Sequence, residues 1–493
     1  MSATPSKRRR KPAHGLPESH AALFTDFYEL TMAQGYFLTG KAASPATFDY
    51  FFRENPFGGG YVIFAGLEDL LSLLESLEFR PDDIDYLRSL KFHNDFLSYL
   101  QRFRFRGTIH SVSEGEPVFP LEPLVRVDGT LLETQLVETV LLNLLNFESL
   151  IATKASRIRL AAGDKRLVDF GLRRAQGLGG IHASKAAIIG GVDATSNVYS
   201  AFTYGLQTSG TLAHSWVQSF DDELSAFRTF AELFPDGCVL LVDTYNTLTS
   251  GIPNAIAVAR ELEKKGKRLL GIRLDSGDLA YLSKKARSML DDAGLSGVKI
   301  VVSNQLDEYL IRSLLQQGAP VDTFGVGTRL VTAEGSPSLD GVYKMSMCDD
   351  KPRIKFSDNI SKTTLPGSKK LVRYSMDGDE FRADGVLLDA ERSVDEIHHP
   401  YLAGQSTRVS GLREEPLFEK RMEDGKRVSA ERRAETSALY ARDRLRHLSP
   451  EHRRFENPHT YKVGVSQKLL NLREDLSRHH GADGRSRRAR SAG

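Results

Sequence analysis

The chain has 493 residues, of which 40% are apolar and 26% charged, and its formal net charge is +2. This length exceeds one ordinary hydrophobic core, so we expect two or three packed domains with a globular composition. The near-neutral charge and the lack of an apolar run of about 18 residues argue against nucleic acid or a membrane as partner.

Basic residues are concentrated at the two ends of the chain, in residues 7–11 and 485–490. We interpret residues 1–19 and 476–493 as disordered basic tails; a targeting or nucleic-acid role is the alternative. The N-terminus lacks the apolar segment of a secretory signal, and the chain has only two cysteines. That number is too small for a disulfide scaffold and fits a reducing compartment, so we expect a cytoplasmic protein.

The first ordered part, residues 20–130, is predicted to be an N-terminal domain of mixed helices and strands. A helix is expected over 21–38, and strands over 46–52 and 108–113. Residues 133–160 follow as a long helix or a helix pair with a leucine-rich face. We interpret that face as core packing and not as a cofactor site.

Residues 167–331 alternate short apolar runs with amphipathic helical patterns, within a domain that we place at 131–345. Single helices between strands predict βαβ units and parallel pairing, as in a barrel or a doubly wound sheet. The expected strands are LVDFGLRR, CVLLVDT, LLGIRLDSGD, VKIVVSN and VDTFGVGT, and the expected helices are 221–234, 252–264, 278–293 and 306–317.

After Tyr343 the pattern changes to short strand-like pieces, such as RIKFS and LVRYS, separated by turns. Helical segments follow from about Ser429. We interpret residues 346–475 as a small C-terminal subdomain.

Polar residues and glycines directly follow the predicted strands. Parallel α/β folds bind ligands at the carboxyl ends of their strands, so these residues predict one site for a polyanion. For any one of them, capping of the next helix is the alternative. The residues are Arg173, Arg174, Asp243, Asp275, Ser276, Gly277, Ser303, Asn304, Gly325, Gly327 and Thr328.

The residue types suggest how such a site would work. The glycines of FGVGT (324–328) allow backbone amides to approach a phosphate, although this motif alone could be only a tight turn. Asp243 and Asp275 could hold Mg²⁺ on a pyrophosphate or stabilise a developing cation; a helix cap or an arginine salt bridge is the alternative. His214 stands alone, and by itself such a histidine is more often structural.

Eight motifs occur in this order: FTDFYELTMAQGYF, VDFGLRRAQG, GTLAHS, LLVDTYNT, GIRLDSGDL, VVSN, FGVGT and LDGVYKM. Together they resemble the nicotinate phosphoribosyltransferase family, from about Ala21 to Tyr343. A weaker likeness continues through TLPGS and LSPEHRRFENPHTYKVGVSQKL, and the two basic tails lie outside it.

The resemblance implies a type II phosphoribosyltransferase fold, in which an α/β sandwich is packed on an irregular, incomplete α/β barrel. In this family the C-terminal subdomain completes the sandwich, and a homodimer shares its active sites between subunits. The implied reaction joins nicotinic acid to phosphoribosyl pyrophosphate, giving nicotinate mononucleotide, a precursor of NAD. Mg²⁺ is the implied cofactor, and ATP is a facultative co-substrate.

The resemblance also implies roles for individual residues. Tyr28 and Phe170 would enclose the pyridine ring, with Thr211 at the same pocket. Arg273 would read the nicotinate carboxylate, and Arg173 would contact the phosphoribosyl substrate. Gly325, Gly327 and Thr328 would hold the 5-phosphate. Asp243 would act near the ribose and pyrophosphate, beside Asp275 and Ser276. His214 would be phosphorylated by ATP, which replaces its structural interpretation.

Two alternatives remain at this stage. A nicotinamide-specific relative would share the fold and the phosphohistidine, although GIRLDSGDL with GTLAHS favours the enzyme for the acid. A catalytically silent paralogue that serves as a scaffold is the other. The presence of Arg173, His214, Asp243, Arg273 and Thr328 argues against it.

Overall fold

The computed structural model describes residues 20–357, 363–402 and 404–491, with side chains up to residue 479. The expected tail 1–19 lies outside these residues. The chain forms two compact units, one from residues 1–150 with 338–493 and one from 151–337. We call them the outer-chain unit and the central unit. The units divide at 150/151, within the long helix α6 (Glu138–Ala162), and at 337/338. The sequence analysis placed these boundaries at 130/131 and 345/346.

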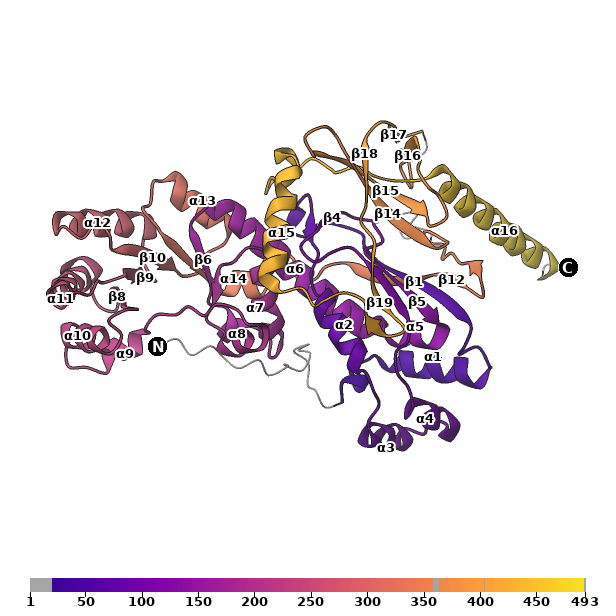
Figure 1. Ribbon diagram of the computed structural model, residues 1–493, viewed down its shortest axis with the longest axis horizontal. Coiled ribbons are helices and arrows are strands. Elements are labelled where there is room, and N and C mark those ends of the chain that lie inside the picture. Colours follow the sequence, from indigo (N-terminus) through magenta and orange to yellow (C-terminus); the bar gives the residue numbers. More distant parts are fainter. Residues whose placement is uncertain (1–19, 358–362, 403, 492–493) are drawn as a thin grey trace. The chain divides into compact units, whose positions relative to one another are not determined.

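The outer-chain unit is built on a seven-stranded sheet with the order β13-β12-β1-β5-β3-β19-β20 and a six-stranded sheet with the order β17-β16-β21-β15-β14-β18 (Figure 1). Strand β12 (Gly341–Cys348), which follows the central unit in the sequence, pairs antiparallel with β1 (Pro45–Phe52). Segments that precede and follow the central unit in the sequence therefore share one sheet. The remaining strands of the first sheet are β3 Thr108–Ser111, β5 Val125–Thr130, β13 Lys351–Pro352, β19 Glu419–Glu423 and β20 Lys426–Arg427.

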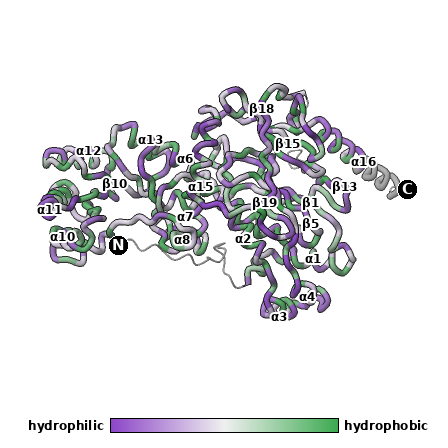
Figure 2. Tube along the Cα trace, viewed as in Figure 1, coloured by the Kyte–Doolittle hydropathy of each residue, from purple (hydrophilic) through white to green (hydrophobic). Residues whose placement is uncertain are grey.

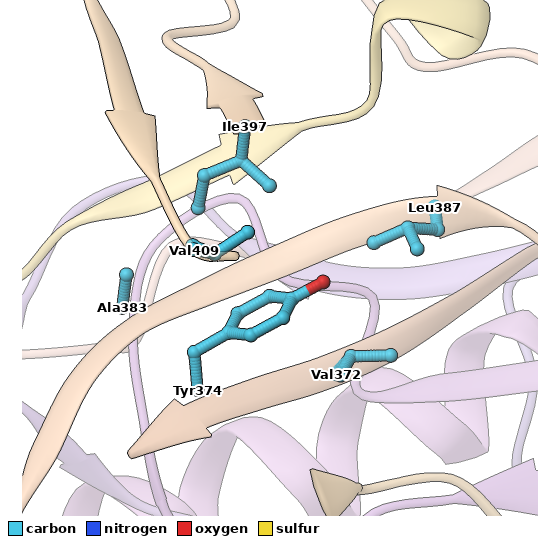
Figure 3. Packing of buried hydrophobic residues seen from close by; sticks show 6 residues of the cluster. All are labelled: Val372, Tyr374, Ala383, Leu387, Ile397 and Val409. Atoms are coloured by element: carbon cyan, nitrogen blue, oxygen red, sulfur yellow. The ribbon is translucent and has the colours of Figure 1, made fainter. Parts of the chain in front are cut away.

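The second sheet encloses a small core of its own. Figure 3 shows Tyr374 among aliphatic side chains of β14 (Lys369–Ser375), β15 (Phe381–Leu388) and their neighbours. Nearly every residue of β14 and β15 is buried, and side chains on one face of the sheet, such as Val372 with Tyr374 and Ala383 with Leu387, form this core. The remaining strands are β16 Glu396–His398, β17 Ser406–Arg408, β18 Arg413–Pro416 and β21 Val463–Val465; β2 (Val62–Ile63) and β4 (Pro117–Val118) form a separate pair.

The helices of the outer-chain unit are α1 Phe27–Leu38, α2 Leu67–Ser76, α3 Pro81–Ser89, α4 Asn94–Leu100, α5 Leu131–Leu136, α15 Ala434–His447 and α16 Gln467–Ser491. The predicted strand RIKFS was wrong. Residues 353–357 form no strand: Arg353 N still donates to Ser346 O of β12, but Lys355 N donates to the Thr364 hydroxyl instead of to a ladder partner. Helix α16 runs through residues 476–491, where a disordered tail was expected.

The central unit is a six-stranded parallel sheet with the order β7-β6-β11-β10-β9-β8. Its two edges, β7 and β8, do not pair with each other, so the barrel is incomplete. The strands are β6 Arg166–Asp169, β7 Ala194–Thr195, β8 Val239–Leu241, β9 Gly271–Leu274, β10 Lys299–Ser303 and β11 Thr323–Val326. The predicted βαβ alternation is confirmed, and the short strand β7 is an addition to it.

Amphipathic helices connect these strands (Figure 1). Helix α11 has the predicted bounds, Ile252–Lys264, and buries residues on one face, from Ile252 to Leu262. Green and purple segments alternate along such helices in Figure 2, as expected where one face packs and the other meets water. The others are α7 Gly179–Ile189, α8 Val198–Tyr204, α9 His214–Gln218, α10 Glu223–Leu233, α12 Leu279–Asp292, α13 Glu308–Gln316 and α14 Thr328–Val331. No helix among the described residues is both long enough and apolar enough to span a bilayer.

Candidate active site

Polar side chains gather at the carboxyl ends of the central strands, as predicted. Parallel pairing fixes this, because the register sets Arg273 beside Val301 and Ser303 beside Gly325. All of the predicted site residues except Tyr28 belong to the central unit. Tyr28 lies on α1 of the outer-chain unit, where 48% of its side-chain surface is exposed. Burial and the neighbouring Glu29 carboxylate raise the pKa of Tyr28, so its hydroxyl stays protonated.

Arg273 is the most firmly held of these side chains. It is buried, and its guanidinium donates from Nε to the Ser303 hydroxyl at 2.9 Å and from Nη1 to the Thr211 hydroxyl at 2.9 Å. Nη2 donates to Asp275 Oδ1, also at 2.9 Å. The Phe170 ring lies over the guanidinium, with 5.3 Å between ring centroid and Cζ. A planar cation fixed in this way is suited to reading a planar anion.

Two carboxylates form a wall beside Arg273. Asp243 follows β8, and its Oδ2 accepts hydrogen bonds from Asp275 N and from the Ser276 hydroxyl, both at 2.7 Å. Its other oxygen, Oδ1, is buried and has no hydrogen-bond partner in the part of the chain that the structure describes. A buried acceptor without a partner is costly, so this oxygen is available to a ligand.

The carboxylates of Asp243 and Asp275 provide a small number of oxygen ligands for Mg²⁺. The unpartnered Asp243 Oδ1 is a hard oxygen ligand of the kind that Mg²⁺ prefers, and Asp275 is its neighbour. One or two carboxylates are the usual protein share of a magnesium site, with water and phosphate oxygens supplying the rest. The residues present therefore fit a magnesium ion carried by a pyrophosphate.

His214 is the first residue of α9, and its partly exposed side chain lies next to Asp275. Its Nδ1 lies 3.2 Å from the Thr244 hydroxyl, and its Nε2 lies 3.9 Å from Asp275 Oδ2. Asp275 therefore stands between His214 and Arg273. The imidazole is accessible to a ligand, unlike that of a histidine whose nitrogens are both satisfied in a core.

The FGVGT segment contains the last three residues of β11, the connecting residue Gly327 and the first residue of α14. A Cβ at Gly325 would lie 2.4 Å from the Phe170 ring, so only glycine lets that ring occupy its place. Gly327 precedes α14, and Thr328 is the first residue of that helix; both are partly exposed. A short turn with small residues and an accessible hydroxyl is compatible with a phosphate.

The turn after β6 carries Phe170 and Arg173 and is anchored by a residue that the sequence analysis did not single out. Asp169 is fully buried and accepts hydrogen bonds from Gly171 N, Ser184 Oγ and Thr195 Oγ1 at 2.7–2.8 Å. Burial raises the pKa of its carboxyl group. Arg173 lies on the 3-10 segment Leu172–Arg174, and its side chain is exposed.

A cavity of about 710 Å³ opens inside the incomplete barrel. Phe170 and Thr211 line its end nearest the polar wall, and short side chains such as Val168, Val301 and Thr323 line its interior. A complete barrel fills this space with bulky side chains. The interior therefore leaves room for a flat heterocycle against Phe170 and Thr211, the two lining residues that also contact Arg273.

The sequence analysis also missed Thr244 and left Ser303 without a role. Both stand in polar strand-end positions, LLVDTYNT and VVSN, and that position was the available signal. Which hydroxyl meets which charged side chain depends on rotamers and register, and a motif does not give these.

Comparison with known proteins places nearly the whole chain in one set of family models. These are the nicotinate phosphoribosyltransferase N-terminal domain at residues 23–146, the nicotinate phosphoribosyltransferase family at 165–404, and the nicotinate phosphoribosyltransferase C-terminal domain at 368–473.

Individual relatives match over almost their full length. A nicotinate phosphoribosyltransferase of Bacillus subtilis (strain 168) is 42% identical over 469 residues, covering 92% of this chain and 94% of the relative. That of Homo sapiens is 36% identical over 533 residues, covering 93% and 98%.

Solved structures agree. The crystal structure of human nicotinic acid phosphoribosyltransferase superimposes with a TM-score of 0.83 at 34% identity, covering 92% of this chain and 99% of that one. A nicotinate-nucleotide pyrophosphorylase from Pyrococcus furiosus has a TM-score of 0.68 at 23% identity, covering 90% and 99%, a likeness that concerns the fold alone. The fold class expected from the sequence is confirmed.

Proposed function

The chain belongs to the nicotinate phosphoribosyltransferase family, and we propose that it joins nicotinic acid to phosphoribosyl pyrophosphate, releasing pyrophosphate. The product, nicotinate mononucleotide, is a precursor of NAD. The observation that carries this proposal is the buried Arg273, which contacts Phe170 and Thr211 where these two residues line a cavity. A fixed guanidinium beside an aromatic ring suits an aromatic ring that bears a carboxylate.

In the proposed reaction the pyridine nitrogen attacks the anomeric carbon of the sugar. The new C–N bond forms as the C–O bond to pyrophosphate breaks, and the electron pair leaves with the pyrophosphate oxygen. Arg273 holds the carboxylate, and Phe170 and Tyr28 enclose the pyridine ring. Thr211 borders the same pocket. The protein accelerates this displacement by positioning the two substrates and stabilising separated charge.

The second substrate is held by the strand ends around this pocket. Gly325, Gly327 and Thr328 receive the 5-phosphate, and Arg173 contributes a positive charge. Asp243, with Asp275 and Ser276 beside it, faces the ribose and the magnesium pyrophosphate. Bound magnesium supplies charge neutralisation for the leaving pyrophosphate.

We test the function with purified protein, Mg²⁺, phosphoribosyl pyrophosphate and either nicotinic acid or nicotinamide, measuring mononucleotide and pyrophosphate. Product from nicotinic acid at a higher kcat/KM than from nicotinamide is expected. Equal or faster turnover of nicotinamide would show the nicotinamide-specific alternative. No pyrophosphate release with either pyridine would show a silent paralogue.

We further propose that ATP is a co-substrate that phosphorylates His214, which would make the enzyme an ATP-dependent ligase. The accessible imidazole beside Thr244 and Asp275 supports this proposal. His214→Ala is expected to keep slow synthesis without ATP and to lose the acceleration by ATP, because the histidine carries a phosphoryl group and does not attack the sugar. Product and ADP are measured together; ADP released in step with product by the variant would contradict the role of His214.

A homodimer is the proposed assembly, in which the outer-chain unit of one subunit completes the site of the other. Helix α1 exposes Phe27, Tyr28 and Met32, and the central unit exposes Val198 and Tyr199, apolar surfaces of the kind that subunit contacts bury. We also propose a cytoplasmic location, because Cys238 and Cys348 are both unpaired.

The shared site predicts a result for mixed subunits. Arg273→Ala and Tyr28→Ala are each expected to be nearly inactive, since each damages a different half of every site. When the two variants are dissociated and mixed equally, half of the dimers are mixed and carry one intact site of two. Activity should return to about one quarter of the unaltered enzyme. Re-association of each variant with itself is the control, and mixing that restores no activity would place each site within one subunit.

A further inference from the structure

Ser303, at the end of β10, closes a ring of hydrogen bonds with Arg273 and Asp275. Its side chain is buried, and its hydroxyl accepts a hydrogen bond from Arg273 Nε at 2.9 Å. The same hydroxyl donates to Asp275 Oδ1, the oxygen that also accepts from Arg273 Nη2. A serine has a single hydroxyl proton, so this ring fixes the direction of both of its hydrogen bonds.

The ring determines which parts of the Arg273 guanidinium remain open. The group has five N–H bonds. One on each nitrogen is taken, by Ser303, by Thr211 and by Asp275 respectively. Of the two that remain, the one on Nη1 makes only a long hydrogen bond to Leu212 O, with 3.5 Å between the two heavy atoms, and among the described residues the one on Nη2 meets no acceptor. This weakly held N–H on Nη1 and the unused N–H on Nη2 form a fork that matches the two oxygens of a carboxylate.

We propose that Ser303 is a positioning residue that sets the preference for an acid over an amide, an inference that rests on the proposed function. Without the Ser303 hydroxyl, Nε has lost its acceptor, while Asp275 remains close by. A guanidinium and a carboxylate favour two parallel hydrogen bonds, so Arg273 would turn to form such a pair with Asp275. That pair uses the N–H on Nε that Ser303 had held, so the number of unused N–H bonds stays the same, but the guanidinium has turned and the unused bonds no longer point at the ligand.

The charge of Arg273 alone does not provide this preference. Asp275 already neutralises it at 2.9 Å, so the pocket attracts a second carboxylate only where free N–H bonds point at it. An uncharged amide makes weaker hydrogen bonds with the same fork and loses less when the fork turns. Ser303 therefore acts on nicotinate far more than on nicotinamide.

The test is the ratio of kcat/KM for nicotinate to kcat/KM for nicotinamide, measured on the same preparation of the full chain. This ratio does not depend on the fraction of protein that is folded. In Ser303→Ala it is expected to fall about tenfold to a hundredfold, through a higher KM for nicotinate. KM for phosphoribosyl pyrophosphate should stay unchanged.

Two further variants separate positioning from simple packing. Ser303→Thr keeps the hydroxyl and is expected to restore most of the ratio. Ser283→Ala removes another buried hydroxyl, one that bonds only Ala280 O of its own helix, and should leave the ratio unchanged.

An unchanged ratio in Ser303→Ala, or a fall in Ser303→Thr as large as in Ser303→Ala, would overturn the inference while the proposed function stands. Unaltered protein without any preference for nicotinate would overturn the proposed function, and this inference with it.

Discussion

Arg273→Ala is expected to lower kcat/KM for nicotinate by about 30- to 5,000-fold. Truncating one member of a buried charge pair typically costs about 2–5 kcal/mol, because the other charge is left unpaired. Here that charge is the substrate carboxylate in a partly desolvated pocket. Nicotinamide carries no charge that would be left unpaired, so its kcat/KM should fall far less. Steady-state kinetics with both pyridines measure the difference.

Arg273 also pairs with Asp275 at 2.9 Å, so a structural role of Arg273 has to be distinguished from recognition of the substrate carboxylate. Arg273→Lys should recover only part of the loss, since an ammonium lacks the fork. Arg228→Ala is the matched control, because Arg228 forms an exposed pair with Glu261 on neighbouring helices. Such an exposed, solvent-screened pair contributes little to stability. Equal losses on both pyridines, with a large drop in Tm, would mean that Arg273 only holds the barrel together.

Asp243→Asn is expected to lower kcat by about 100- to 1,000-fold, the usual size for removing one preorganised electrostatic group from a transition state. Asparagine keeps the shape and can still accept from Asp275 N and Ser276. What it loses is the negative charge on the buried Oδ1, which no described residue satisfies. KM for nicotinate should change little, and the Mg²⁺ concentration for half-maximal rate should rise.

Asp278→Asn provides the control for this change. Asp278 stands in the loop after β9, whose Asp275 and Ser276 donate hydrogen bonds to Asp243, and it caps α12 by accepting from Tyr281 N at 3.0 Å. Asparagine caps a helix as well as aspartate does, so both kcat and Tm should stay close to those of the unaltered protein. If Asp243→Asn kept its kcat and lost only thermal stability, Asp243 would be a structural brace for the β9 loop.

The order of strands and helices in the central unit could be predicted from the sequence because its signals are local. Apolar periodicity over 13 residues gave the bounds of α11, and five apolar runs gave β6, β8, β9, β10 and β11. The topology of parallel sheets then predicted that Asp243, Asp275 and Ser303 would meet at one edge. The ordered motifs supplied the family, which composition alone did not.

Other features depended on residues that are distant in the sequence. Strand β12 pairs with β1 almost 300 residues earlier, and RIKFS, which has a strand-like pattern, found no ladder partner. Strand pairing is chosen by the packing of the whole sheet, which an isolated segment does not encode. The same applies to α16, whose course through residues 476–491 was not expected from its basic composition.

Within the site, the tertiary structure alone decided which polar groups are satisfied and which are open. The sequence placed Ser303 and Asp275 at strand ends, but only the fold shows that one hydroxyl ties Arg273 to Asp275. Likewise, one carboxylate oxygen of Asp243 accepts hydrogen bonds from the β9 loop, and the other has no partner among the described residues. Hydrogen bonds act over about 3 Å, so these outcomes follow from rotamers and register, and residue types alone do not fix either of them.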